Sequence, residues 1–170
     1  MEIARATIEE ELERHHADGF AWAMACCGRD RSEAEDVLQT SYLKVLDGRA
    51  VFASRSTFKT WLFGVIRRTA AEHHRWRALR RFRSVSLAER ADPSPDPATA
   101  AGHSESAARL VGALATLTAR QRQLLHLVFY QDLTIGEAAG VLGIAIGTAR
   151  THYERGKQRL RELLTLEDDR

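Results

Sequence analysis

Residues 134–155 of the chain are TIGEAAGVLGIAIGTARTHYER, and their pattern predicts two helices joined by a tight turn. Thr134 and Glu137 have the spacing of a capping box, in which both side chains satisfy free backbone amides at a helix start. The alanines after Glu137 are small enough for a second helix to cross closely. Gly143 suits a left-handed turn residue. The segment therefore has the length, the helix start and the turn residue of a helix-turn-helix.

The second helix of this motif is basic. Residues 147–161 contain five Arg and Lys residues against one Glu, a net charge of +4. Basic and hydroxyl side chains on such a helix suit DNA phosphates and base edges. An ordinary helical hairpin with a solvated basic face is the alternative, but the charge and the motif length favour DNA binding. The candidate contacts are Thr148, Arg150, Thr151, His152, Arg155 and Lys157.

Helical spacing of apolar residues continues outside this motif, and no alternating strand pattern is present. A capping box at Thr118–Gln121 predicts another helix in the C-terminal half. In the N-terminal half, a capping-box pattern at Ser32–Glu35 predicts the start of a helix that stops at Gly48. A long helix is expected to begin near Thr57. The fold class is therefore predicted to be all-α.

The prolines predict where the chain divides. Pro93, Pro95 and Pro97 are the only prolines among the 170 residues, and all fall within residues 84–106. Proline cannot continue a helix, and this polar stretch cannot bury a core. We therefore expect two small helical domains, residues 1–83 and 107–166, joined by a flexible linker at 84–106.

The charge is distributed unevenly between these parts. Residues 1–50 carry a net charge of −5, whereas residues 51–83 carry nine basic residues against Glu72, a net charge of +8. Aromatic residues interleave with the bases in the second segment, as is typical of surfaces that bind single-stranded nucleic acid. Individual rings such as Phe58 and Trp61 have the spacing of core residues. The uneven charge predicts both a polyanionic and a protein partner.

Composition and cysteine usage exclude several classes of protein. The hydrophobic fraction of 44% and the charged fraction of 28% are those of a globular chain. No apolar run has the ~20 residues of a membrane span, so we expect no membrane insertion. Cys26 and Cys27 are the only cysteines; they cannot build a disulfide framework, which favours the cytoplasm. Neither these cysteines nor the pair His15–His16 predicts a metal site, and we expect no cofactor and no enzymatic activity.

The motifs together resemble the extracytoplasmic-function (ECF) sigma factors of bacterial RNA polymerase. Residues 34–46 and 52–76 resemble the second conserved region of that family, and residues 114–164 resemble the fourth. These segments read AEDVLQTSYLKVL, FASRSTFKTWLFGVIRRTAAEHHRW and LATLTARQRQLLHLVFYQDLTIGEAAGVLGIAIGTARTHYERGKQRLRELL. The resemblance implies promoter-specific initiation of transcription.

The resemblance also implies roles for particular residues. Glu35, Asp36 and Gln39 would dock on the clamp helices of core RNA polymerase, while the final helix would read the −35 element as duplex. The basic segment would melt the −10 element and capture its non-template strand. The residues implied for the −10 element are Arg55, Ser56, Lys59, Arg67, Arg68, Glu72, His73, Arg75 and Trp76.

The implied partners are core RNA polymerase, through its clamp helices and flap, promoter DNA in duplex and melted form, and an anti-sigma factor. The free protein is expected to be a monomer. At Arg68 and Glu72 the family often has Asn and Asp. These differences leave the identity of the captured base undetermined. Gly156 stands where the family usually has Ala, and should cost ~1 kcal/mol unless it permits close packing.

Two other interpretations remain open at this stage. A response-regulator-like helix-turn-helix regulator would bind duplex operators, usually as a dimer, but would leave the Trp-rich basic segment unexplained. A sigma mimic would sequester an anti-sigma factor without touching DNA. A native mass measurement and a test of operator binding would distinguish the regulator from a sigma factor. Transcription assays with charge-reversed variants would distinguish the mimic from a sigma factor.

Overall fold

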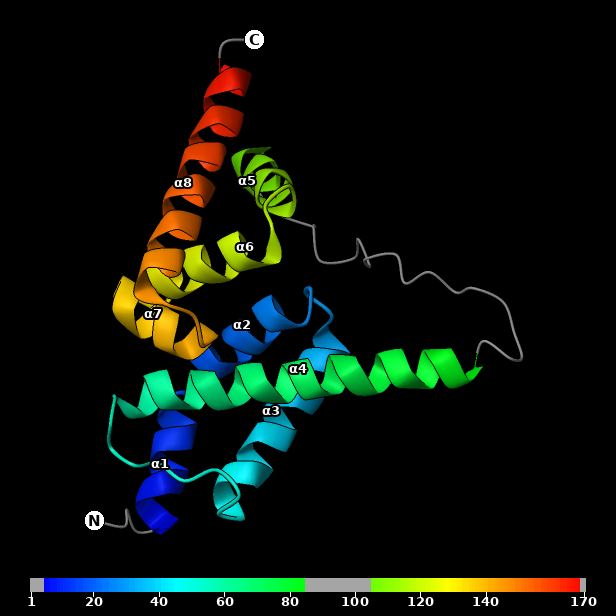
Figure 1. Cartoon of the computed structure of the whole chain (residues 1–170), viewed down its shortest axis with the longest axis vertical. Helices are drawn as coiled ribbons and strands as arrows, with labels where there is room; N and C mark the ends of the chain where they lie inside the picture. Colours follow the sequence, from blue (N-terminus) through cyan, green and yellow to red (C-terminus); the bar gives the residue numbers. More distant parts are fainter. Residues whose placement is uncertain (1–4, 85–104, 169–170) are drawn as a thin grey trace. The chain divides into compact units, whose positions relative to one another are not determined.

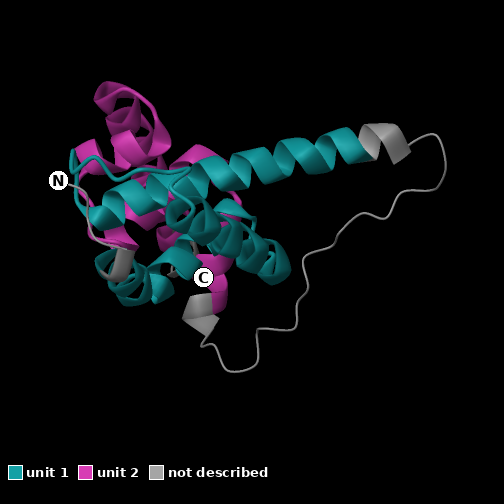
Figure 2. Cartoon of the chain, turned by 90° about the horizontal axis from the view of Figure 1, so that it is seen from below, with its two compact units in different colours: residues 1–94 teal, residues 95–170 magenta. Residues whose placement is uncertain are grey.

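The computed structural model describes residues 5–84 and 105–168, and the described residues form helices connected by turns and short loops, with no strand among them (Figure 1). The chain divides into two compact units, Met1–Ser94 and Pro95–Arg170 (Figure 2). The prediction of an all-α fold is confirmed. Most of the expected linker lies outside the described residues; at its edges, Ser84 is still helical and a new helix begins at Glu105.

The first unit contains α1 (Arg5–Arg14), α2 (His16–Cys26), α3 (Arg31–Leu46) and α4 (Phe58–Ser84). Helices α2, α3 and α4 pack on one another, and Trp22 of α2 lies fully buried among them. Its indole Nε1 donates a hydrogen bond to the carbonyl oxygen of Phe63 at 3.0 Å, and its ring stacks on that of Phe63. A buried indole with a satisfied N–H is a strong anchor, so Trp22 fixes α4 against α2.

Helix α3 begins differently from the prediction. The N-cap is Asp30, whose carboxylate accepts a hydrogen bond from the Glu33 amide at 2.9 Å. The capping box expected at Ser32–Glu35 is therefore wrong, because an equally good cap lies two residues earlier. The helix ends near Gly48, which has a φ of +69° as expected of a stop residue.

The long helix α4 begins as predicted. The Thr57 hydroxyl accepts a hydrogen bond from the Thr60 amide at 3.2 Å. Buried side chains on α4 end at Ala70, and most of the following residues are exposed. Trp76 lies in this exposed part of α4 and is 64% exposed. Helices α2 and α3 still contact this part of α4, but through polar side chains, since His74 approaches the Cys26 carbonyl oxygen and Arg77 donates to Glu33.

The second unit contains α5 (Glu105–Ala115), α6 (Ala119–Leu125), a π-helical segment η1 (His126–Tyr130), α7 (Ile135–Leu142) and α8 (Ile146–Asp168). Helix α8 packs against α5, α6 and α7. The core of this unit is built from fully buried leucines and small residues. They are Leu124, Leu127, Ala138, Ala139, Leu142 and Ala149.

The predicted helix-turn-helix is present in α7 and α8. Thr134 and Glu137 form both hydrogen bonds of a capping box at the start of α7. Gly143 has a φ of +61°, and its amide and the next one bond back to α7 carbonyls. This is the pattern of a left-handed helix stop, so Gly143 sets the turn between the two helices. The capping box at Thr118–Gln121 is also confirmed, at the start of α6.

Candidate nucleic-acid interface

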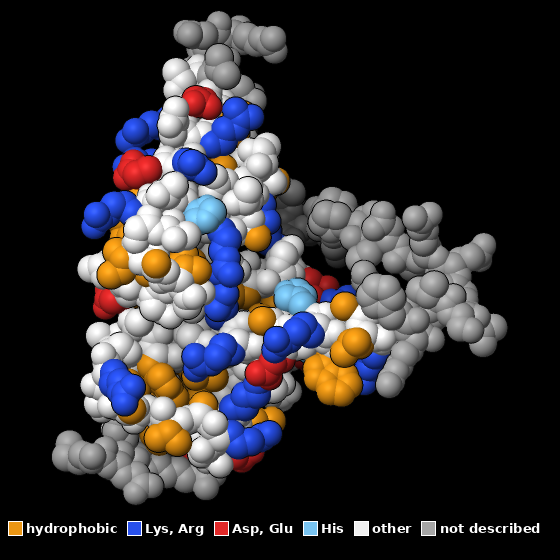
Figure 3. Space-filling view, viewed as in Figure 1, with side chains coloured by type: hydrophobic (Ala, Val, Ile, Leu, Met, Phe, Trp, Pro, Cys, Tyr) orange, Lys and Arg blue, Asp and Glu red, His pale blue; other side chains and the backbone are white. Residues whose placement is uncertain are grey.

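Helix α4 presents basic and aromatic side chains to solvent on the side away from its buried residues. Arg68, Glu72, Arg75 and Trp76 are all exposed, and their spacing of four, three and one residues places them on one side of the helix. Basic side chains gather along α4 in the space-filling view (Figure 3). The structure thus brings together two exposed arginines of the predicted −10 set, Arg68 and Arg75, and its indole.

Three other members of that set have partners within the protein. Lys59 is 2.9 Å from Asp18 of α2 and lies over the Phe63 ring. Glu72 is 2.5 Å from the Lys44 ammonium group of α3. His73 lies 3.0 Å from Glu33 of α3. These contacts join α4 to α2 and α3. Lys59, Glu72 and His73 therefore stabilise the packing of the first unit.

The remaining residues of the set lie in the loop before α4 and on α4 itself. Arg55 and Ser56 are exposed, and Arg67 lies half-buried on α4 itself. The loop is anchored by Phe52, whose ring packs edge-on against Phe58 at 5.5 Å. The same ring lies 5.3 Å from Trp61. Sequence reasoning missed Phe52; its position as the only aromatic residue in an otherwise small and polar loop was the available signal.

Helix α8 presents the predicted −35 residues on its first turns. Thr148, Arg150, Thr151 and Arg155 are exposed, while His152 and Lys157 are half-buried. The Thr151 hydroxyl donates a hydrogen bond to the Gly147 carbonyl at 3.0 Å. The Lys157 ammonium group is 3.0 Å from Glu154 and lies over the Tyr153 ring. The arginines of this set, Arg150 and Arg155, are thus both exposed on α8.

The predicted polymerase-docking residues lie together on α3. Glu35, Asp36 and Gln39 are exposed, and Glu35 is 2.9 Å from Arg31. Beside them lies a shallow hollow of about 350 Å³ between α2 and α3. Its floor includes Tyr42, whose pKa burial raises to about 12, so its hydroxyl stays protonated. The hollow is lined by His16, Phe20, Arg31, Glu35, Leu38, Gln39 and Tyr42.

The two residues in each of the pairs His15–His16 and Cys26–Cys27 have different surroundings. His15 faces Glu11 and Phe58, whereas His16 faces Tyr42. Burial is the largest cause of a pKa well above the usual range at Cys26, and it raises the pKa of Cys27 to about 12. Within the described residues, the one group with metal-ligand character is Cys27, Glu33 and His74, which no sequence spacing indicated.

Comparison with known proteins identifies the family. Residues 12–81 match the model of Sigma-70 region 2, and residues 113–162 match the model of Sigma-70 region 4. The chain is 30% identical over 158 residues to the RNA polymerase sigma factor CarQ of Myxococcus xanthus, covering 91% of this chain and 88% of that protein. It belongs to the ECF sigma factors.

Other proteins similar to this sigma factor are sigma factors as well. It is 31% identical over 156 residues to the ECF RNA polymerase sigma factor RpoE of Cereibacter sphaeroides, covering 89% of this chain and 83% of that protein. Its fold resembles the sigma factor RpoE from Bartonella quintana, solved in complex with the anti-sigma factor NepR. That match has a TM-score of 0.73 and 26% identity, and covers 94% of this chain and 97% of the other.

The family decides between the interpretations left open by the sequence. Region 2 and region 4 together are the parts of a sigma factor, and the chain is a subunit that directs RNA polymerase to promoters. The response-regulator-like and mimic interpretations are not favoured. Within the described residues, none of the helices is both long and apolar enough to cross a membrane.

Proposed function

We propose that this sigma factor divides promoter recognition between its two units, with the −10 element on α4 and the −35 element on α8. The observation that carries the proposal is the pairing of two separate basic, exposed helix faces with separate cores. One face bears an exposed indole beside arginines, which suits an unstacked single strand. The other belongs to a helix-turn-helix, which suits an intact major groove.

On α4, we assign the strand contacts first to Arg68, Arg75 and Trp76. All three are exposed on one side of the helix, so phosphate and base contacts require no rearrangement of the fold. Arg55 and Ser56 extend this surface from the preceding loop. Lys59, Glu72 and His73 hold α4 in place through their contacts with α2 and α3. We assign them a positioning role at the −10 element.

On α8, we assign the base contacts to Arg150 and Thr151, and the phosphate contacts to Thr148, Arg155 and Lys157. Arginine pairs with guanine through two hydrogen bonds, and this is the commonest specific contact in the major groove. His152 is half-buried and reaches the groove edge only. The −35 sequence is therefore expected to include guanine at the position facing Arg150.

We further infer two protein partners. Glu35, Asp36 and Gln39, beside the hollow on α3, provide an acidic and polar surface for the clamp helices of core polymerase. An anti-sigma factor is inferred from the Bartonella quintana relative, which was solved with one. The protein is proposed to work in the cytoplasm and to leave catalysis to the polymerase.

Run-off transcription with purified core polymerase and genomic promoter fragments tests the proposal. Arg68→Gln with Arg75→Gln is expected to reduce open-complex formation strongly, because both side chains contact melted DNA in the proposal. Arg14→Gln is the matched control, an exposed arginine on α1 outside the proposed surface. Each lost phosphate contact should also reduce the slope of log affinity against log salt by about 0.7–0.9. Equal activity of the double variant and the control would reject the α4 assignment.

A further inference from the structure

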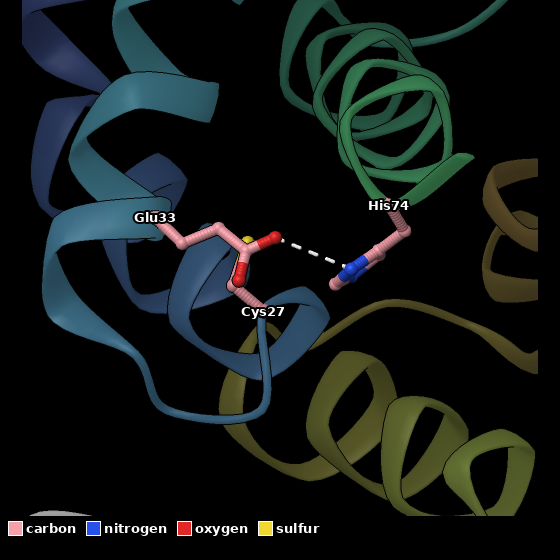
Figure 4. A group of neighbouring side chains, drawn as sticks. All are labelled: Cys27, Glu33 and His74. Carbon is pink, nitrogen blue, oxygen red and sulfur yellow. Dashed lines mark ion pairs between the residues drawn. The ribbon is translucent and has the colours of Figure 1, made fainter. Parts of the chain in front are cut away.

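Three side chains from different parts of the first unit meet at one point. Cys27 follows α2, Glu33 lies in the first turns of α3, and His74 lies on α4 (Figure 4). Their sulfur, oxygen and nitrogen atoms all lie within 4.8 Å of one another. We call this group the Cys27 cluster. Cys27 and Glu33 are buried, and His74 is about half exposed, so an ion could reach the cluster from solvent.

The two ring nitrogens of His74 have different neighbours. Nε2 lies 3.2 Å from the carbonyl oxygen of Cys26, which can only accept a hydrogen bond. Nδ1 lies 3.2 Å from Oε1 of Glu33. If Nε2 carries the proton of a neutral ring, Nδ1 turns a lone pair toward the carboxylate. Two acceptors at this distance repel each other unless a proton or a metal ion lies between them.

The distance suits a metal ion. Two ligands bound at about 2.0 Å to one tetrahedral zinc ion lie about 3.3 Å apart, and the observed separation of Nδ1 and Oε1 is 3.2 Å. Metal-binding histidines usually donate their other ring N–H to a backbone carbonyl or a carboxylate. The contact from Nε2 to Cys26 meets that requirement without any rearrangement.

Neighbouring residues hold the carboxylate of Glu33 in place. Arg77 donates a hydrogen bond to its Oε2, which leaves Oε1 facing the cluster. His73 also approaches Oε1, at 3.0 Å, and a carboxylate oxygen has a second lone pair, so it can keep this contact while it binds an ion. Arg77 thus acts as an outer-shell residue that orients the carboxylate.

The buried thiol distinguishes the two cations. An ion pair between His74 and Glu33 needs no sulfur, yet Cys27 is placed beside both, with 4% exposure. A sulfur, a nitrogen and an oxygen ligand together suit zinc, which is borderline in softness.

We propose that Cys27, Glu33 and His74 form a three-ligand Zn²⁺ site that joins the end of α2, α3 and α4. Binding forms a bond between the ion and Sγ of Cys27 and releases the thiol proton to solvent. The fourth position of the ion is left to water, as in zinc sites that remain open. The site lies between α3, which carries the expected docking residues, and α4, which carries the expected DNA residues.

Cobalt substitution tests the site directly. The full-length, tag-free protein is stripped with a chelator and titrated with Co²⁺ alone. Thiolate ligation gives a sulfur-to-cobalt charge-transfer band in the near ultraviolet, which is expected to saturate at one ion per chain. Zn²⁺ should then remove the band by displacement. Absence of the band would overturn the proposal.

The adjacent cysteine supplies a matched control. Cys27→Ser should abolish the charge-transfer band, whereas Cys26→Ser should retain it. A band that survives Cys27→Ser, or that depends on Cys26 instead, would reject the assignment.

A second variant keeps the test valid if Cys27→Ser does not fold. His74 is partly exposed, so His74→Gln should fold normally and still lose most of its Co²⁺ affinity. The expected loss exceeds the ~10–100-fold typical of outer-shell substitutions. His16→Gln, on α2 and outside the cluster, is the control and should bind as the parent does. Equal affinity of the two histidine variants would also reject the site.

Discussion

Gly156 shows how one missing methyl group permits two helices to approach. A Cβ atom built at this position would lie 3.2 Å from Cβ of Gln121 and 3.2 Å from Cδ1 of Leu125, both on α6. Gln121 is held by the capping box at the start of α6, and Leu125 is buried. The close packing explains why glycine is tolerated inside α8 despite its low helix propensity.

Gly156→Ala is therefore expected to lower the free energy of unfolding of the second unit by about 1 kcal/mol, because the overlap outweighs the gain in helix propensity. Gly112→Ala on α5 is the control. No atom lies within 4 Å of a Cβ there, so that variant should gain up to ~1 kcal/mol. Urea unfolding followed by circular dichroism measures both, and a stabilised Gly156→Ala would contradict the packing argument.

Glu137 makes the stability of the helix-turn-helix depend on pH. Its carboxylate accepts hydrogen bonds from the amide and the hydroxyl of Thr134, at 2.9 and 2.7 Å. These bonds hold the pKa of Glu137 below its ordinary value in the folded state. The resulting stabilisation is fully present above the unfolded pKa of about 4.3 and is lost as the pH falls through the lower, folded value.

We expect Glu137→Gln to lower the stability of the second unit at pH 7 by about 0.5 kcal/mol, since the charge is lost while an acceptor remains. The difference from the parent should shrink as the pH falls below about 4.3. Thermal unfolding at several pH values measures it, with Glu162→Gln on α8 as the control. A difference that is constant with pH would show that the charge plays no part.

Prediction from sequence succeeded where contacts are local and failed where they are not. The capping boxes at Thr118 and Thr134 and the turn at Gly143 involve neighbours in sequence, and all three are confirmed. The prediction for the cap of α3 was wrong because Asp30 and Ser32 are both good N-cap residues and each is followed three residues later by a glutamate. Glu33, between them, has its partners on α4 about 40 residues away, which no local pattern reveals.

At the level of the helices, a change of helix type decides which side chains are exposed. The capping box at Thr118–Gln121 predicts a helix, but the structure changes from α-helix to π-helical η1 at His126, and η1 extends to Tyr130. Its wider turn accommodates buried Leu127 and leaves Phe129 and Tyr130 exposed. Residue spacing on a regular helix cannot predict such a change of pitch.

Two arginines of α8 separate base reading from simple charge. Arg150 is exposed on the second helix of the helix-turn-helix, whereas Arg159 lies more than two turns later and faces Glu162. Arg150→Gln is expected to cost about 1–3 kcal/mol at the matching base pair and to relax selectivity there. Arg159→Gln should leave selectivity unchanged. Holoenzyme binding to a set of single-base −35 variants measures both, and equal profiles would reject the role of Arg150.

For the molecule as a whole, the two cores are separate. Trp22, Leu62 and Phe63 are fully buried in the first unit, and Leu124 and Leu142 are buried in the second. All three tryptophans, Trp22, Trp61 and Trp76, belong to the first unit. Tryptophan fluorescence therefore reports on that unit alone, while far-ultraviolet circular dichroism reports on both.

We expect the two units to unfold independently. Leu124→Ala should lower the stability of the second unit by about 2–5 kcal/mol and leave the midpoint of the tryptophan fluorescence transition unchanged. Leu62→Ala, the matched substitution in the first unit, should shift that midpoint. A fluorescence midpoint that moves in Leu124→Ala would show that the cores are coupled.

The self-contained core of Pro95–Arg170 has an evolutionary consequence. Under the proposed division of labour, a lineage can exchange this cassette for that of a relative without rebuilding the part that grips melted DNA. New regulons can then arise by recombination at the junction between cassettes, one promoter half at a time.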